Sequence, residues 1–96
     1  MIVYAPRALR DLQKIEAYIQ QFNAPAARRV IAAIKRAIDT LGSFPNIGVV
    51  KNEAGHRRIN VRRYPYAVFY RVAGDDVLVL HVRHTAQKPI DLETEL

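Results

Sequence analysis

The chain contains no cysteine, so its fold and its chemistry do not depend on thiols. This absence excludes disulfides, iron–sulfur clusters and thiolate zinc sites, and it suits a protein of the reducing cytoplasm. No stretch approaches the roughly 18 apolar residues of a membrane-spanning helix. Met1 is followed within a few residues by Tyr4, Pro6 and Arg7, so there is no apolar signal core. We therefore expect a cytoplasmic protein with no membrane contact.

The common sequence signatures of enzymes are absent as well. The chain has no glycine-rich phosphate loop, no nucleophile elbow and no paired carboxylates. His56, His81 and His84 lack the spacing of a metal site, and no cysteine or nearby carboxylate completes one. A chain of 96 residues leaves little room for the cavity of a large cofactor. We expect no metal ion and no cofactor.

Acidic residues are scarce in the middle of the chain. Fifteen Lys and Arg oppose nine Asp and Glu, which gives a formal net charge of +6, and 11 of the cations are arginines. No acid occurs over residues 54–74, where five arginines fall, and acids return at Asp75 and Asp76 and in the C-terminal tail. Arginine favours bidentate contacts with carboxylates or phosphates. The central region therefore indicates an anionic partner, either nucleic acid or an acidic protein.

Apolar periodicity predicts the order of the secondary structure elements. A short strand over residues 2–4 precedes two helices that begin near Pro6 and Pro25. Each helix carries apolar residues at spacings of three or four along one side, as a helical hairpin packed on a sheet requires. Asp11 of the first helix and Arg36 of the second are expected on the opposite, solvent-facing side. A loop over residues 43–48 follows, marked by its Pro, Asn and Gly. Three further strands are predicted over residues 57–63, 66–72 and 77–84.

These elements predict an α+β fold, with an N-terminal strand, a helical hairpin and then a three-stranded antiparallel meander. The chain has no linker, repeat or low-complexity segment, so we expect a single domain over residues 1–96. Residues 86–96 are expected to form a polar C-terminal tail.

Alternation along the three strands of the meander separates two faces. The apolar face is expected to pack against the helices, and His84 ends the last strand on that side. It contains Ile59, Val61, Val68, Tyr70, Val72, Leu78, Leu80 and Val82. The opposite face is cationic, with no acid among its members. It contains Arg58, Arg62, Arg71, His81 and Arg83, together with Asn60 and Phe69.

The cationic face has two interpretations. It is either the ordinary solvated side of an antiparallel sheet or a binding surface. Like charges on neighbouring strands repel, so such a cluster adds no stability to the fold. We favour a binding surface for an anionic partner or target, with Asn60, Phe69 and His84 in secondary roles. A histidine at a strand end more often makes hydrogen bonds than acts in catalysis.

The order of the elements, with four local motifs, resembles the RelE/ParE superfamily of bacterial type II toxins. The resemblance extends over residues 1 to about 89 and implies the RelE/ParE-like βααβββ fold. The motifs are Phe44–Gly48, Gly55–Ile59, Tyr64–Val72 and Val77–His84.

The superfamily contains two activities, and the resemblance favours one of them. RelE-like toxins are ribosome-dependent endoribonucleases that cleave mRNA, and they carry lysines, or a Glu and a His, with a Tyr or His near the C-terminus. Here Thr85–Lys88 contains no tyrosine, and no lysine lies in the meander. That acid–base set is therefore not evident, unless His81 or His84 supplies it. The Pro45–Gly48 and Tyr64–Val72 motifs resemble the ParE-like branch, whose members are associated with inhibition of DNA gyrase.

The resemblance implies a growth-arresting toxin that is an inhibitory binding protein rather than an enzyme, with no confident catalytic residue. The alternatives are a RelE-like mRNA endoribonuclease and, outside the toxins, a simple nucleic-acid-binding module. The resemblance also implies a cognate, ParD-like antitoxin, whose acidic C-terminal segment would be drawn to the cationic face, and DNA gyrase as the target. Toxin and antitoxin of this kind form hetero-oligomers that bind DNA only through the antitoxin.

Overall fold

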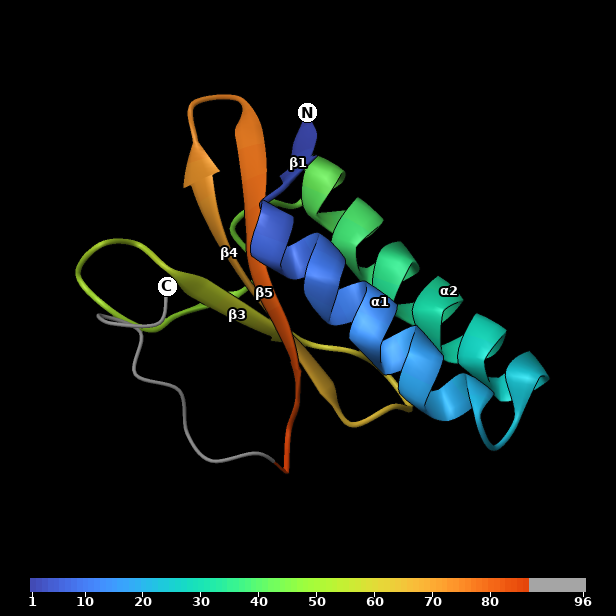
Figure 1. The fold of residues 1–96 in the computed structure, drawn as a ribbon. Helices are drawn as coiled ribbons and strands as arrows, with labels where there is room; N and C mark the ends of the chain where they lie inside the picture. Colours follow the sequence, from blue (N-terminus) through green and yellow to red (C-terminus); the bar gives the residue numbers. More distant parts are fainter. Residues whose placement is uncertain (87–96) are drawn as a thin grey trace.

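The computed structural model describes residues 1–86, in which two helices lie side by side against one face of a five-stranded sheet (Figure 1). The strand order is β1-β5-β4-β3-β2, and β1 pairs with β5 in parallel while the other pairs are antiparallel. The predicted polar tail lies outside the described residues from residue 87 on. The elements are β1 (Ile2–Tyr4), α1 (Pro6–Gln20), α2 (Ala24–Ser43), β2 (Val49–Val50), β3 (Arg57–Asn60), β4 (Tyr66–Ala73) and β5 (Asp76–His84).

The helical hairpin forms as its sequence predicts. Pro6 occupies the first turn of α1, where its missing N–H removes no helical hydrogen bond. Asn23 caps α2 by accepting a hydrogen bond from the backbone N–H of Ala26 at 3.0 Å. Within residues 1–86, neither helix has the length and apolarity needed to cross a membrane. The apolar stripe of α2 is buried against the sheet at Ala27, Val30, Ile31, Ile34, Ile38 and Leu41.

The sheet confirms the predicted meander, but β3 ends at Asn60 and not at the predicted residue 63, so Arg62 lies beyond the strand. The core face of β5 also differs from the prediction. Val68 pairs with Val82, whereas Tyr70 pairs with Val79, so Leu80 is an extra residue at a β-bulge in β5. Because the bulge changes the parity of the strand, Val77 and Val79 are the buried residues there. The prediction that Leu78 and Leu80 belong to the core is wrong. Both are half-buried, and Leu78 pairs with Arg71 on the opposite face.

The loop between α2 and β3 is held against the sheet by Tyr70. The Tyr70 hydroxyl donates to the carbonyl of Pro45 at 2.7 Å and accepts from the N–H of Gly48 at 2.9 Å. A Cβ at Gly48 would lie 2.5 Å from that hydroxyl, so only glycine fits this close approach. Arg57 Nη1 adds bonds to the carbonyls of Asn46 and Gly48 at 3.0 and 2.8 Å. This anchoring places β2, which the sequence did not predict, beside β3.

Candidate partner-binding surface

Three residues of the predicted cationic face form a row across the sheet. Arg58 of β3, Phe69 of β4 and His81 of β5 are successive cross-strand partners. The guanidinium carbon of Arg58 lies 5.7 Å from the Phe69 ring centroid. The rings of Phe69 and His81 are stacked, with centroids 6.1 Å apart and planes at 20°. Phe69 is only 2% exposed, so it supports its neighbours instead of offering a surface of its own.

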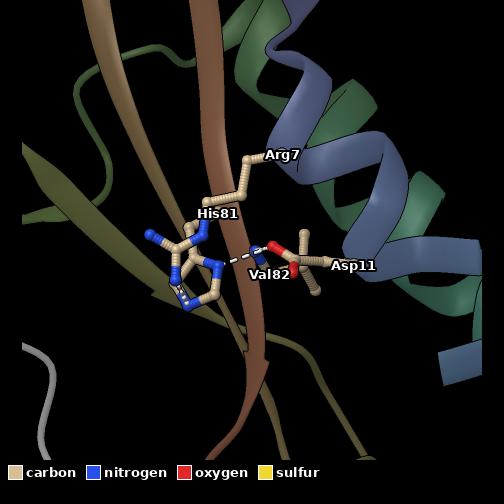
Figure 2. A network of polar contacts seen from close by, with 4 residues as sticks. All are labelled: Arg7, Asp11, His81 and Val82. Atoms are coloured by element: carbon tan, nitrogen blue, oxygen red, sulfur yellow. Dashed lines mark hydrogen bonds and ion pairs between the residues drawn. The ribbon is translucent and has the colours of Figure 1, made fainter. Parts of the chain in front are cut away.

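His81 is buried and is contacted by two side chains of α1, so it does not lie on an open face. Its Nδ1 is 2.5 Å from Oδ2 of Asp11, which also accepts the backbone N–H of Val82 at 3.0 Å. Its Nε2 is 3.5 Å from Nη2 of Arg7 (Figure 2). The structure therefore corrects the prediction that the helices leave His81 uncovered, because α1 supplies both Arg7 and an acid to it. Both ring nitrogens are engaged inside the protein.

Asp11 acts where the cover of β5 by β1 ends. Strand β1 pairs with β5 only from Val77 to Val79, so within residues 1–86 no strand pairs with the following residues of β5 on that side. Here the Asp11 carboxylate accepts a hydrogen bond from the backbone N–H of Val82. A paired edge amide is protected both from water and from pairing with another chain.

Arg83 and His84 lie at a cleft between α1 and the end of β5, with a volume of about 650 Å³. The ring of His84 packs edge-on against that of Tyr66, with ring centroids 5.2 Å apart. Its Nδ1 accepts a hydrogen bond from the N–H of Ala86 at 3.0 Å. Burial, with a smaller contribution from Tyr18, raises the pKa of Tyr66 above its usual value. We call this site the β5 cleft. It is lined by Arg7, Asp11, Lys14, Ile15, Tyr18, Tyr66, His81, Val82, Arg83 and His84.

Arg58, Asn60 and Arg62 lie at a different site, a groove of about 760 Å³ beside α2. Arg58 Nε donates to Oδ1 of Asn60 at 3.1 Å, which fixes both side chains at the edge of β3. We call this site the β3 groove. It is lined by Ala33, Arg36, Ala37, Thr40, Ile47, Val49, Arg58, Ile59, Asn60, Arg62, Arg63 and Tyr64.

The single cationic face predicted from the sequence is therefore divided. His81, Arg83 and His84 belong to the β5 cleft, while Arg58, Asn60 and Arg62 belong to the β3 groove. Arg71 is exposed, pairs with Leu78 and lines neither site. Among residues 1–86 there is no group of three His, Cys, Asp or Glu side chains able to hold a metal ion.

Comparison with known proteins places this geometry in a family. The family described as "ParE toxin of type II toxin-antitoxin system, parDE" matches residues 2–89. The chain belongs to the ParE toxin family. The match covers both helices and every strand, so the β5 cleft and the β3 groove are parts of a type II toxin of the ParE/RelE kind.

Relatives of this ParE-family chain carry both names of the superfamily. A putative toxin Y4kP of Sinorhizobium fredii is 38% identical over 82 residues, covering 85% of this chain and 84% of its own. Toxin RelE2 of Caulobacter vibrioides is 35% identical over 86 residues, which cover 90% of this chain and 96% of its own. The chromosomal ParDE toxin–antitoxin system of P. aeruginosa contains a similar fold, with a TM-score of 0.76 at 20% identity over 86% and 92% of the two chains.

Sequence reasoning missed several residues of the two sites. Asp11 and Arg7 are about 70 residues away from His81, and a contact between a helix and a distant strand leaves no local pattern. Arg36 was assigned to the outer side of its helix, although it borders the β3 groove. The loop that borders the β3 groove did have a sequence signal, because Phe44–Gly48 is one of the motifs of the family resemblance.

Proposed function

We propose that this ParE-family toxin arrests growth by inhibiting DNA gyrase, as a binding protein and not as a ribonuclease. The observation that carries the proposal is that both ring nitrogens of His81 contact side chains of the protein itself, Asp11 and Arg7. Cleavage of RNA through its 2′-hydroxyl needs a general base and a general acid directed at the substrate. No lysine occurs from residue 52 to residue 86 to take either role.

The proposal includes neutralisation by a cognate, ParD-like antitoxin with an acidic C-terminal segment. The support is the excess of arginine on the two sites, since complementary charge speeds association and selects the partner. Toxin and antitoxin would form a cytoplasmic hetero-oligomer that binds DNA only through the antitoxin.

Growth and gyrase assays on one protein test this proposal. Expression of the chain alone should stop growth, and co-expression of the reading frame beside its gene should restore it. The purified chain should then block supercoiling of relaxed plasmid by gyrase. Addition of the purified protein encoded by the neighbouring reading frame should reverse this inhibition. Growth arrest without an effect on supercoiling at a large molar excess would remove gyrase as the target.

One observation favours a second candidate, a RelE-like endoribonuclease. Asp11, His81, Arg7 and Arg83 share the β5 cleft, and a carboxylate that orients a histidine is a recurring arrangement in acid–base catalysis. This candidate requires cleavage of mRNA on translating ribosomes, lost in His81→Ala and Arg83→Ala. Intact mRNA with the unaltered protein would exclude it.

A further inference from the structure

The β5 cleft carries more positive than negative charge. Among residues 1–86 the one acid that lines it is Asp11, which already accepts hydrogen bonds from His81 and Val82 (Figure 2). Three permanent cations line the same cleft: Arg7 and Lys14 of α1, and Arg83 of β5. A cleft lined by charge of one sign concentrates the field and attracts ions of the opposite sign. The β5 cleft is therefore suited to an anionic occupant.

Apolar side chains line the β5 cleft beside its cations. Ile15 and Tyr18 come from α1, and Tyr66 comes from β4. Tyr18 is 64% exposed, and its ring packs edge-on against that of Phe22, with ring centroids 5.5 Å apart. An aromatic ring held in this way offers apolar surface at a small cost in conformational entropy. The cleft therefore suits an occupant that has both acidic and apolar side chains.

The chain itself contains a segment of this composition. Residues 90–96 read Ile-Asp-Leu-Glu-Thr-Glu-Leu, so three acids alternate with three apolar residues and one threonine. The segment has no cation, and it follows the end of the family match at residue 89. In an extended chain successive side chains point to opposite sides. The alternation would therefore direct Asp91, Glu93 and Glu95 to one side of the segment and its apolar residues to the other.

The acidic segment follows the β5 cleft closely along the chain. It lies outside the described residues, but the last of these, Ala86, donates its N–H to Nδ1 of His84, a residue that lines the cleft. Each extended residue spans about 3.3 Å, so residues 87–90 can cover up to about 13 Å. A short linker gives a tethered segment an effective concentration on the order of 1 mM. The acids of the segment therefore have a large advantage over anions in solution.

We propose that residues 90–96 occupy the β5 cleft of their own chain, with their acids against its cations and their apolar side chains against Ile15 and Tyr18. The occupied cleft then excludes other anions. Nucleic acid is the most abundant of these, and a chain with a formal net charge of +6 attracts it without regard to sequence. The segment is thus an internal competitor that limits non-specific binding. The proposal does not depend on gyrase as the target, because it concerns contacts within one chain.

Paramagnetic broadening of amide signals tests where the segment lies. The chain has no cysteine, so Thr94→Cys provides a single thiol for a nitroxide label. The label should broaden the amide signals of Arg7 and Asp11 and spare that of Arg36 beside the β3 groove. The control adds Asp91→Asn, Glu93→Gln and Glu95→Gln, which should remove the broadening. Equal broadening with and without the three acids would overturn the proposal. Broadening only between different molecules, in a mixture of spin-labelled and isotope-labelled chains, would assign the cleft to a second copy instead.

Nucleic acid binding measures the exclusion itself. The probe is single-stranded DNA of about 20 nucleotides at low salt, titrated into two variants of equal net charge. One variant carries the three amide substitutions of the segment. The matched control carries Asp39→Asn, Glu53→Gln and Asp75→Asn, which remove three exposed acids that do not line the cleft. The Kd of the segment variant should be at least about threefold lower than that of the control, because only this variant has an open cleft. Equal Kd values would overturn the proposal.

Discussion

At the scale of single residues, Asp11 connects the two layers of the molecule. One carboxylate oxygen accepts from the ring of His81 and from the backbone of Val82, and His81 in turn lies beside Arg7. A polar group that is shielded from water costs free energy when its partner is removed. Asp11 therefore stabilises the contact of α1 with β5 and also sets the geometry of the β5 cleft.

Replacement of Asp11 should show this cost directly. Asp11→Ala leaves the Val82 amide and the His81 ring without their acceptor, so the free energy of unfolding should fall by about 1–3 kcal/mol. Glu16→Ala is the control, because Glu16 is an exposed acid of the same helix and should change stability by no more than about 0.5 kcal/mol. Urea denaturation followed by circular dichroism measures both, and equal midpoints would refute the role of Asp11.

The sequence could not have predicted this contact. Parity along β5 assigned His81 to the uncovered face, and helical periodicity assigned Asp11 to the solvent side of its helix. Both patterns are local, whereas the position of α1 over the end of β5 follows from how the layers pack. Arg58, Asn60 and Phe69 were assigned to one face by alternation, and β3 and β4 have no bulge to disturb it. Their role in binding stays a prediction.

At the scale of elements, the bulge in β5 decides which residues form the core. It turns Val79 inward and leaves Leu80 outside the core clusters. A bulge carries no residue signature here, since Val77–Leu80 is continuously apolar and fits either parity. The helices were predictable because their apolar stripes are long. Strand β2 was not, because two valines in an irregular loop give no period.

Two truncations in β5 distinguish the two registers. Val79→Ala should lower the free energy of unfolding by about 2–3 kcal/mol, because Val79 is fully buried and its loss leaves a cavity. Leu80→Ala removes more atoms but should cost less than Val79→Ala, because Leu80 is only half-buried. The reverse order in urea denaturation would restore the register read from the sequence.

At the scale of the whole molecule, neither layer is complete without the other. The core clusters join residues of both helices to residues of β3, β4 and β5, so the helical hairpin buries its apolar stripe against the sheet. This arrangement agrees with a single domain, which stays a prediction of the sequence. The two cationic sites lie on opposite sides of the central strand β4, at the edges formed by β3 and β5.

A single domain predicts one cooperative unfolding transition. Calorimetry should give equal calorimetric and van't Hoff enthalpies, as two-state unfolding requires. Circular dichroism of the helices and fluorescence of the tyrosines should report the same midpoint. A separate, earlier loss of helix would show that the hairpin and the sheet unfold independently.

The pairing of β1 with β5 also has a consequence for the time course of synthesis. Ile2 pairs with Val77, so β1 has no partner strand until β5 has been synthesised. At about 5–20 residues per second, Val77 is added roughly 4–15 s after Ile2. Pairings this distant in sequence also slow folding, because the intervening chain must be closed into a loop first. The nascent toxin therefore completes its sheet, and with it the β5 cleft, only after residues 76–84 have been synthesised.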